Sequence, residues 1–536
     1  MAHRRYPNAL FILLIVSAAA RLSESTVLAQ ASATSESTGQ VAKANLDALI
    51  ALAMKEFKVP GLCVAIVKDD QVVVSQGYGV RKMGNDEAVD SETLFAIASN
   101  TKAFTAIALG ILVDQGKINW NDPVVDHLPG FRMTDRYVTS ELNVLDLLVH
   151  RSGLGLGAGD LLFWPPTTHS RKDLVKRLRN VPLATSFRAH YAYDNVLYPV
   201  AGELIETVTG KSWEDFVQME ILDRVGMNRS IVSSSGLAKA TNIASPHARI
   251  DGQVRVVGSF AIDNANPAGG ISSCAVDMAK WHRVLLSGGK LSDGSRLYSQ
   301  QTAKRLWTLV TPIPIGDFHE KLLPSKPNFR GYALGFSVQD YRGAKLVAHT
   351  GGLPGYLSIS VLLPDQNLGV VVLTNQESSA AFRSIAYSVL DHFLDAETDW
   401  VDAFKVATNA RRAKYQGTDD KTNQARSDST EHSLPLEQYA GTYTDRWYGD
   451  VILKYQQDQL IIQFAHTRVL EGTLEHWQHD TFVARWSDRE LRADAFVTFD
   501  LNPDGSIHQI RMRSVSAATD FSFDFHHLLL KPKPAM

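Results

Sequence analysis

A serine and a lysine lie three positions apart at the start of an apolar segment, as Ser99-Asn100-Thr101-Lys102. Residues 99–115 have helical periodicity with Gly116 as the stop, so both side chains lie on one helix face and the amine can reach the hydroxyl oxygen. A lysine whose pKa falls on burial can take the serine proton, and the helix N-terminus favours the negative charge that develops. The pair is a candidate nucleophile and base; the alternative interpretation is a helix cap followed by a solvated lysine.

The S-x-x-K spacing alone is weak, because roughly two matches are expected by chance in a chain of this length. A second match, Ser287-Gly288-Gly289-Lys290, is indeed present. Its two glycines indicate a loop that would hold neither side chain, so we interpret it as a turn.

Tyr193-Asp194-Asn195 precedes an apolar helical stretch over 198–208. A tyrosine phenol near cations can pass a proton, and an asparagine can hydrogen-bond a substrate amide. The alternative is an aromatic residue before a helix with an asparagine cap.

His349-Thr350-Gly351-Gly352 ends a predicted strand over 344–348. Two glycines at a strand edge let a substrate backbone approach closely. The Gly352 N–H and the Ser99 N–H would together form an oxyanion hole. The alternative is a tight turn after the strand.

In this order the three motifs resemble those of the serine β-lactamase and penicillin-binding-protein superfamily. The resemblance is strongest to its class C β-lactamase, D-alanyl-D-alanine carboxypeptidase and esterase branch, and it covers roughly residues 42–400. Residues 148–154 match the L-x-H-x-S-G-L segment of that branch, and residues 195–227 and 268–279 match two further stretches.

The resemblance implies a role for each motif residue. Ser99 would be the acylated nucleophile, Lys102 its activating partner and Tyr193 the proton shuttle. Asn195 would position the acyl-side amide, and the substrate would lie along His349, Thr350 and Gly351. Whether Lys102 or Tyr193 is the acylation base stays open. The family acyl-enzyme is released by water, or by an acceptor amine or alcohol, and no metal or cofactor is implied.

Two residues depart from the family pattern. His349 stands where the dedicated β-lactamases have lysine, and a histidine, which is only partly charged at neutral pH, is a poorer partner for a β-lactam carboxylate. This favours peptidase, amidase or esterase activity. Arg151 replaces the commoner threonine, with no consequence that the sequence reveals. We therefore predict an exported serine hydrolase; the alternatives are an acyltransferase on the same scaffold or a non-catalytic penicillin-binding or sensor protein.

The elements that must position these residues indicate an α/β (α+β) fold. A hairpin over 61–80 and strands over 332–338, 344–349, 357–363 and 369–374 come from the two ends of the segment, with a helix over 380–393. They predict one antiparallel sheet flanked by helices, beside a lobe of short helices from the middle of the chain. The cleft between sheet and lobe is where a site is expected, under loops 155–190 and 310–330.

Other segments lie outside this domain. Residues 1–29 combine Arg4 and Arg5 with an apolar run and small cleavage-site residues, which is typical of a secretory signal peptide. We expect the end of a helix and a polar linker over 401–433, then a small all-β accessory domain over 434–533, as a sandwich or barrel. Its His526-His527 pair is interpreted as packing or surface on a terminal strand.

Composition excludes several functions. The 536 residues hold 54 Lys+Arg against 57 Asp+Glu, a net charge of −3, which gives no basic footprint for nucleic acid. Two cysteines, Cys63 and Cys274, cannot form a four-cysteine metal site, and we favour two buried thiols over one disulfide. We expect a small-molecule or peptide substrate, no stable membrane anchor and a secreted or periplasmic location. The oligomeric state is not predicted.

Overall fold

The computed structural model describes residues 43–427 and 429–534, in two compact units that divide between Glu56 and Phe57. The first unit is helical from residue 43. The predicted signal peptide at residues 1–29 lies outside the described residues. No helix within the described ranges is both long enough and apolar enough to cross a membrane.

The second unit contains an eight-stranded antiparallel sheet that joins distant parts of the chain, in the order β2-β1-β12-β11-β10-β9-β8-β7. The predicted hairpin is confirmed as its edge, and the two ends of the domain meet where Leu62 pairs with Thr374 and Lys68 with Leu368. The strands are β1 (Gly61–Lys68), β2 (Gln71–Gly79), β7 (Thr311–Pro312), β8 (Arg330–Tyr332), β9 (Ser337–Tyr341), β10 (Ala344–Leu353), β11 (Tyr356–Leu363) and β12 (Leu368–Thr374).

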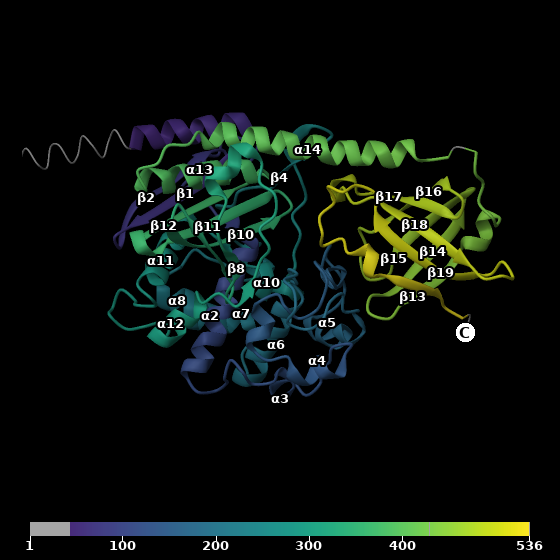
Figure 1. Cartoon of the computed structure of the whole chain (residues 1–536), viewed down its shortest axis with the longest axis horizontal. Coiled ribbons are helices and arrows are strands. Elements are labelled where there is room, and N and C mark those ends of the chain that lie inside the picture. Colours follow the sequence, from purple (N-terminus) through teal and green to yellow (C-terminus); the bar gives the residue numbers. More distant parts are fainter. Residues whose placement is uncertain (1–42, 428, 535–536) are drawn as a thin grey trace, which may run out of the picture. The chain divides into compact units, whose positions relative to one another are not determined.

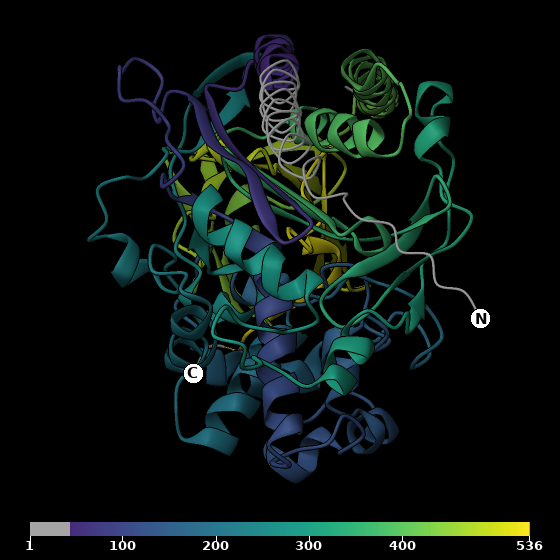
Figure 2. The ribbon, with the colours of Figure 1, turned by 90° about the vertical axis from the view of Figure 1, so that its left-hand side faces the viewer.

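The central strands are nearly continuous runs of Val, Leu and Ile because both faces of the sheet are covered. Every residue of β12 is buried. Helix α11 (Ala275–Leu286) packs on β1 and β12 from one side, and α13 (Ser379–Phe393) packs on β11 and β12 from the other (Figures 1 and 2). Cys63 and Cys274 are both buried and unpaired, as favoured from the sequence.

The prediction of one strand over residues 332–338 is wrong, because this segment contains the end of one strand and the start of the next. β8 ends at Tyr332 and β9 begins at Ser337. Gly335 lies between them with a φ of +77°, a conformation that breaks a strand and that glycine adopts without strain.

The lobe of short helices predicted for the middle of the chain is confirmed. Gly and Pro interrupt it often enough that few of its helices exceed two turns. Besides α11, its helices are α2 (Thr101–Asp114), α3 (Val124–His127), α4 (Arg136–Glu141), α5 (Arg171–Arg177), α6 (Leu197–Thr209), α7 (Trp213–Val217), α8 (Asp223–Val225), α9 (Ser234–Leu237), α10 (Asn266–Gly269) and α12 (Gln300–Leu306). Two small two-stranded sheets complete it, β3 (Phe95–Ala96) with β6 (Ser272–Ser273) and the hairpin of β4 (His247–Ile250) with β5 (Gln253–Val256).

The polar segment that we expect to be a linker from Gln416 onward is helical as far as Gln424. It is the second half of α14 (Trp400–Gln424), whose first turn is buried through Trp400 and Phe404. The anchored first turn lets the exposed polar part continue the helix. Composition alone suggests a linker here, because a helix that is exposed on all sides has the same polar composition as a linker.

The C-terminal module is a closed barrel of eight antiparallel strands, in sequence order, with β20 pairing back onto β13. The sequence predicts six of them and also a terminal strand at 528–530, which corresponds to β20, and it misses β16. His526-His527 lies in a short 3-10 turn before β20 rather than on the strand. The strands are β13 (Gly441–Asp445), β14 (Gly449–Gln456), β15 (Gln459–Phe464), β16 (Glu471–Gln478), β17 (Thr481–Trp486), β18 (Ala495–Leu501), β19 (Ile507–Ser514) and β20 (Leu529–Pro532).

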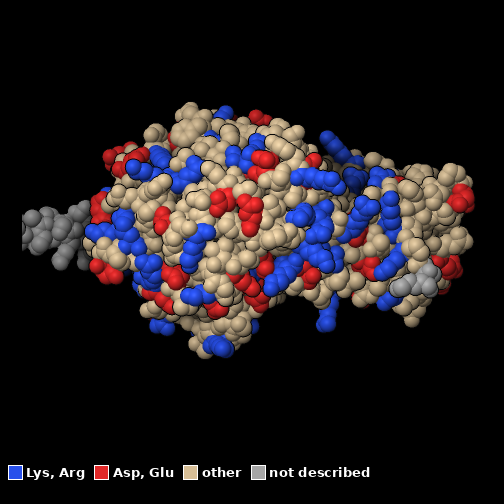
Figure 3. Space-filling view, turned by 90° about the horizontal axis from the view of Figure 1, so that it is seen from below, with Lys and Arg blue, Asp and Glu red and all other residues tan. Residues whose placement is uncertain are grey.

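Charged side chains of both signs are spread over the face seen from below in Figure 3, in keeping with the near balance of 54 basic and 57 acidic residues.

Asp391 in α13 joins the end of β9 to α14, the helix that follows α13. Its carboxylate accepts hydrogen bonds from the Tyr341 hydroxyl, from Arg342 Nε at 2.7 Å and Nη2 at 2.9 Å, and from Trp400 Nε1 at 2.9 Å. We expect Asp391→Ala to lower the free energy of unfolding by about 3–5 kcal/mol, because buried donors and a charge lose their acceptor. Urea denaturation measures this.

Asp402→Ala in α14 is the matched control. The Asp402 side chain is about half exposed and forms an ion pair with Lys321 Nζ at 3.2 Å, so its loss should cost about 1 kcal/mol or less. Equal losses for the two variants would contradict the importance of the buried network.

Candidate active site

Ser99 lies in a short 3-10 turn, η1 (Ala98–Asn100), between β3 and the first turn of α2. Ala98 has a φ of +48°, which few non-glycine residues adopt, so the backbone is strained immediately before the serine. Asn100 Nδ2 donates to Ser358 Oγ of β11 at 2.8 Å and pins this turn to the sheet. The serine is therefore presented from a fixed turn.

The Lys102 amine is fully buried and contacts three oxygens. Nζ lies 3.0 Å from Ser99 Oγ, 2.8 Å from Asn195 Oδ1 and 2.9 Å from the Ala268 carbonyl. The last two oxygens can only accept. A neutral amine can donate its two protons to them and direct its lone pair at the Ser99 hydroxyl.

Burial lowers the pKa of Lys102 to about 7, against the opposing effect of the Asp160 and Asp194 carboxylates. Burial also raises the pKa of Asp194 to about 8, although a hydrogen bond from the Ser152 hydroxyl opposes the rise. A substantial fraction of Lys102 is thus neutral at physiological pH, which is the form able to accept a proton.

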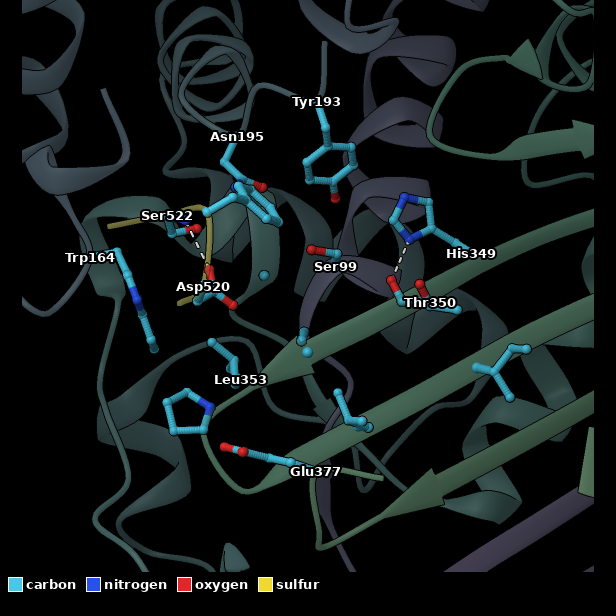
Figure 4. Close-up of a pocket in the computed structure, with 18 of the residues that line it drawn as sticks. Ser99, Trp164, Tyr193, Asn195, His349, Thr350, Leu353, Glu377, Asp520 and Ser522 are labelled. Carbon is cyan, nitrogen blue, oxygen red and sulfur yellow. Dashed lines mark hydrogen bonds between the residues drawn. The ribbon is translucent and has the colours of Figure 1, made fainter. Parts of the chain in front are cut away.

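Tyr193 faces the same amine, which lies 4.9 Å from the centre of its ring, and Figure 4 shows its hydroxyl directed at Ser99. Burial raises the pKa of Tyr193 well above its usual value, and hydrogen bonding to the Ser99 side chain only partly offsets this. The phenol is protonated at neutral pH, so it can give and regain a proton but is not an anionic base.

Asn195 connects the lysine to a buried carboxylate. Its Nδ2 donates to Asp160 Oδ2 at 2.8 Å, which leaves its Oδ1 facing Lys102. Ser522 Oγ donates to the same Asp160 oxygen at 2.8 Å. Burial raises the pKa of Asp160, and the nearby Asp524 raises it further.

Strand β10 forms the opposite wall with an open edge. Its pairing with β9 ends at Ala348 opposite Ser337, so residues 349–353 have no β9 partner. A Cβ on Gly351 would lie 2.0 Å from the Ile97 carbonyl oxygen, so only glycine lets β10 pass this close to the serine turn.

The Gly352 N–H belongs to this open edge. Gly352 lies opposite Leu357, whose carbonyl turns away from β10 and accepts from Thr374 Oγ1 at 3.0 Å. Hydrogen-bonded and non-hydrogen-bonded pairs alternate along an antiparallel ladder, so Gly352 belongs to a non-hydrogen-bonded pair and its N–H points outward. Gly352 lines the same cavity as Ser99, as the oxyanion-hole prediction requires.

His349 is a neutral side chain in this site. Its Nδ1 lies 2.7 Å from the Thr350 carbonyl, an acceptor, so Nδ1 carries the proton and Nε2 accepts from the Tyr332 hydroxyl at 2.7 Å. Burial and the Lys102 charge lower the pKa of His349 to about 3. The neutral His349 therefore does not supply the positive charge that a lysine would supply at this position.

All the residues selected from the sequence thus lie around one cavity of about 880 Å³, apart from the fully buried Lys102 beneath Ser99 and Gly351 behind the strand edge. Their catalytic roles stay a prediction. Loops 155–190 and 310–330 line the cavity, through Phe163, Trp164 and Ile313 among others.

Two other sequence features are structural. Ser287 Oγ of the second S-x-x-K match bonds the Lys290 carbonyl at 3.0 Å within a turn, as interpreted from its glycines. Arg151 Nε bonds the buried carboxylate of Asp146 at 2.8 Å, beside Arg188, and does not line the cavity.

The sequence gives no sign that the barrel contributes to the site. The segment between β19 and β20, residues 515–528, lines the cavity through Asp520, Phe521 and Ser522. Figure 4 shows Asp520 and Ser522 beside Trp164, on the Asn195 side of Ser99. No motif marks such a loop, and only the three-dimensional contact reveals it.

Asp524 anchors this segment to the loop before Asp160. Its buried carboxylate accepts from the backbone N–H groups of Gly159 at 2.7 Å and Leu161 at 3.1 Å. The barrel therefore fixes the loop that carries Asp160, and through it the amide of Asn195. Across the residues described, no group of three or more His, Cys, Asp or Glu side chains could hold a metal ion.

A sheet-and-helix domain with Ser, Lys and Tyr converging at the end of β10 defines the penicillin-recognising class of serine hydrolases. The chain belongs to the Beta-lactamase family, whose model matches residues 46–393. A second model, a domain of unknown function (DUF3471), matches residues 425–532, which hold the barrel.

Curated relatives agree with this assignment, and solved structures share the fold. The unguisins hydrolase ungD of Aspergillus violaceofuscus is 27% identical over 491 residues, which cover 84% of each chain. Protein flp of Staphylococcus aureus is 26% identical over 62% of this chain and 63% of its own. The octameric penicillin-binding protein homologue of Pyrococcus abyssi has a TM-score of 0.58 at 22% identity, covering 88% of this chain and 98% of that one. SurE has a TM-score of 0.51 at 18% identity, covering 92% and 99%, and shares the fold.

Asp524→Ala tests the link between barrel and site. Because two buried backbone N–H groups lose their acceptor, we expect faster amide hydrogen exchange in the peptide that covers residues 157–164, and a loss of about 1–3 kcal/mol in stability. Mass spectrometry after deuterium labelling measures the exchange. Asp504→Ala is the control, since Asp504 bonds Ser506 within an exposed barrel turn, away from the site. Unchanged exchange in Asp524→Ala would contradict the anchoring role.

Proposed function

We propose that the protein cleaves an amide or ester through an acyl intermediate on Ser99. The observation that carries this proposal is the 3.0 Å contact between Ser99 Oγ and the buried amine of Lys102, whose pKa burial lowers to about 7. Membership of the Beta-lactamase family and the hydrolase name of the ungD relative support the same class of reaction.

In the first half of the reaction, Ser99 Oγ bonds the substrate carbonyl carbon while its proton passes to the neutral Lys102 amine. The carbonyl electron pair moves to oxygen, which the N–H groups of Ser99 and Gly352 stabilise. The C=O bond then re-forms and the leaving group departs with a proton that returns from Lys102 through the Tyr193 hydroxyl. Water adds to the acyl-serine by the same route, releasing the acid and restoring the Ser99 hydroxyl.

Lys102 is the better candidate for the acylation base. It loses its proton near neutral pH, whereas the pKa of Tyr193 is raised well above its usual value and its phenol stays protonated. The neutral state of His349 favours a peptidase or esterase over an enzyme that recognises β-lactam carboxylates at this position. We also keep export as a proposal, which rests on the sequence of residues 1–29.

Ser99→Ala tests the nucleophile. We expect the hydrolysis of a p-nitrophenyl ester to fall at least about a thousandfold, because the acyl intermediate cannot form, with little change in Tm. Intact-mass spectrometry after fluorophosphonate treatment should show one adduct on the wild type and none on the variant. Ser287→Ala removes the serine of the other S-x-x-K match and should keep both activity and adduct. Labelling that survives in Ser99→Ala would overturn the proposal.

The pH dependence tests the base. We expect kcat/KM to rise with pH through about 7, because the fraction of Lys102 in the neutral form rises through its pKa. Below that pH the rate should fall about tenfold per pH unit. Lys102→Arg keeps the charge but cannot lose its proton, so it should be inactive across pH 5–9. A wild-type profile that is flat from pH 5 to 9, or a limb that persists in Lys102→Arg, would rule out this assignment.

A further inference from the structure

Asp160 belongs to none of the three motifs, yet only one side chain separates its carboxyl from the Lys102 amine. It begins a short 3-10 turn, η3 (Asp160–Leu162), and is fully buried. Its side-chain partners Asn195 and Ser522 both line the cavity, and Asp160 lies behind them. A substrate in the cavity therefore meets these two partners and not Asp160 itself.

Both partners donate to one oxygen of this carboxyl. Asn195 Nδ2 and Ser522 Oγ each lie 2.8 Å from Asp160 Oδ2, and within the described ranges no hydrogen bond reaches Asp160 Oδ1. Burial of a carboxyl costs free energy that an apolar side chain of similar size would not cost. What the carboxyl adds to the core is thus an acceptor for the Asn195 amide, tied to a hydroxyl of the barrel segment.

The Asn195 amide has two unlike ends, and its orientation decides which end faces Lys102. The amide oxygen accepts protons, whereas the nitrogen donates them. In the structure Nδ2 points to Asp160, and Oδ1 lies 2.8 Å from Lys102 Nζ. That oxygen takes a proton from the amine and leaves the lone pair of the neutral amine for the Ser99 hydroxyl. A reversed amide would donate to the same lone pair and compete with Ser99.

The orientation of the amide is selected by Asp160. Among the described residues, the Asn195 side chain hydrogen-bonds Lys102 and Asp160 alone. A neutral amine can both donate and accept, so it does not distinguish the two ends of an amide. The Asp160 oxygen accepts from two donors at once, so it takes the nitrogen end and leaves the oxygen end for the lysine.

We propose that Asp160 is a positioning residue, which holds the Asn195 amide with its oxygen toward Lys102, and that Ser522 of the barrel holds Asp160 for this task. The inference rests on the proposed function, in which Lys102 takes the Ser99 proton, and it adds control of that step by the C-terminal module. One line of hydrogen bonds thus runs from the barrel to the amine, through Ser522, Asp160 and Asn195.

The test compares Asp160→Ala with Asp160→Asn on p-nitrophenyl acetate, an ester with no acyl-side amide for Asn195 to bind. We expect Asp160→Ala to lower kcat/KM on the high-pH plateau about tenfold or more, because the lysine lone pair is no longer directed at Ser99. Asp160→Asn should stay within about threefold of the wild type, because an amide oxygen in the same place accepts both hydrogen bonds.

The pH profile separates positioning from loosening. The Asp160 charge raises the pKa of Lys102, so its loss favours the neutral amine in both variants. Asp160→Ala also turns an N–H toward the amine and disfavours its charged form further. The rise of kcat/KM with pH should therefore move to lower pH in both variants, about one pH unit further in Asp160→Ala than in Asp160→Asn. A site that merely loosened and admitted water would move the rise to higher pH.

Ser522→Ala tests the contribution of the barrel. We expect the plateau to fall about threefold, as for the loss of one hydrogen bond. The double variant Asp160→Ala/Ser522→Ala should be no slower than Asp160→Ala alone, because Ser522 acts through Asp160. Ser506→Ala is the matched control, since its hydroxyl bonds Asp504 within an exposed barrel turn, and it should keep the wild-type rate.

The outcomes separate the two proposals. Equal plateaus in the wild type and Asp160→Ala, or a rise that moves to higher pH in Asp160→Ala, would overturn the positioning role and leave the proposed function intact. Fully additive losses in the double variant would overturn the part assigned to Ser522. Failure of the wild type to hydrolyse the ester, with no fluorophosphonate adduct on Ser99, would overturn the proposed function itself.

Circular dichroism verifies that each variant is folded. Asp160→Leu fills the space of the carboxyl without an acceptor, and it repeats the comparison with Asp160→Asn if Asp160→Ala does not fold. The same plateau loss and the same shift to lower pH are expected of it, and a wild-type plateau in a folded Asp160→Leu would contradict the positioning role.

Discussion

The site depends on keeping one amine out of water. Lys102 is buried beneath Ser99, and its only polar contacts among the described residues are the hydroxyl it would activate and two oxygens that can only accept. Burial of an ammonium is costly, and here the cost appears as a pKa lowered to about 7. The η1 turn supplies the serine and the start of α2 the lysine, the segment before α6 supplies Asn195, and α10 supplies the Ala268 carbonyl. The helical lobe and the sheet are arranged so that these groups meet at one buried atom.

The same constraint explains the buried carboxylates nearby. Asp160 and Asp194 both favour a charged lysine, so they would undo the effect of burial if they were fully ionised beside it. Burial raises the pKa of each carboxyl, and each is hydrogen-bonded by a serine hydroxyl. For Asp160 that hydroxyl belongs to Ser522 of the barrel. The C-terminal module therefore belongs to the electrostatic surroundings of the lysine as well as to the wall of the cavity.

The motif residues could be predicted from the sequence because each group of them is local. Ser99 and Lys102 are one helical turn apart, and a strand that ends in two glycines is readable without a structure. The contact between Ser522 and Asp160 joins residues 362 positions apart and leaves no local pattern. The fold was predictable for similar reasons, since buried strands are continuous apolar runs. The element boundaries differ from the prediction where a single residue or a distant contact determines them. Gly335 separates β8 from β9, and the buried first turn of α14 lets its exposed polar part stay helical.

The anchoring of the barrel segment has a consequence for the order in which the molecule is made. Ser99, Lys102 and Tyr193 all leave the ribosome before residue 200, and the strand edge follows by residue 353. The segment that holds the loop of Asp160 is synthesised only at residues 515–528, after nearly the whole chain. A nascent or truncated chain can thus carry every motif residue and still have an unfinished pocket. The completed cavity wall is thus a property of the whole polypeptide and not of the segment that carries the motifs.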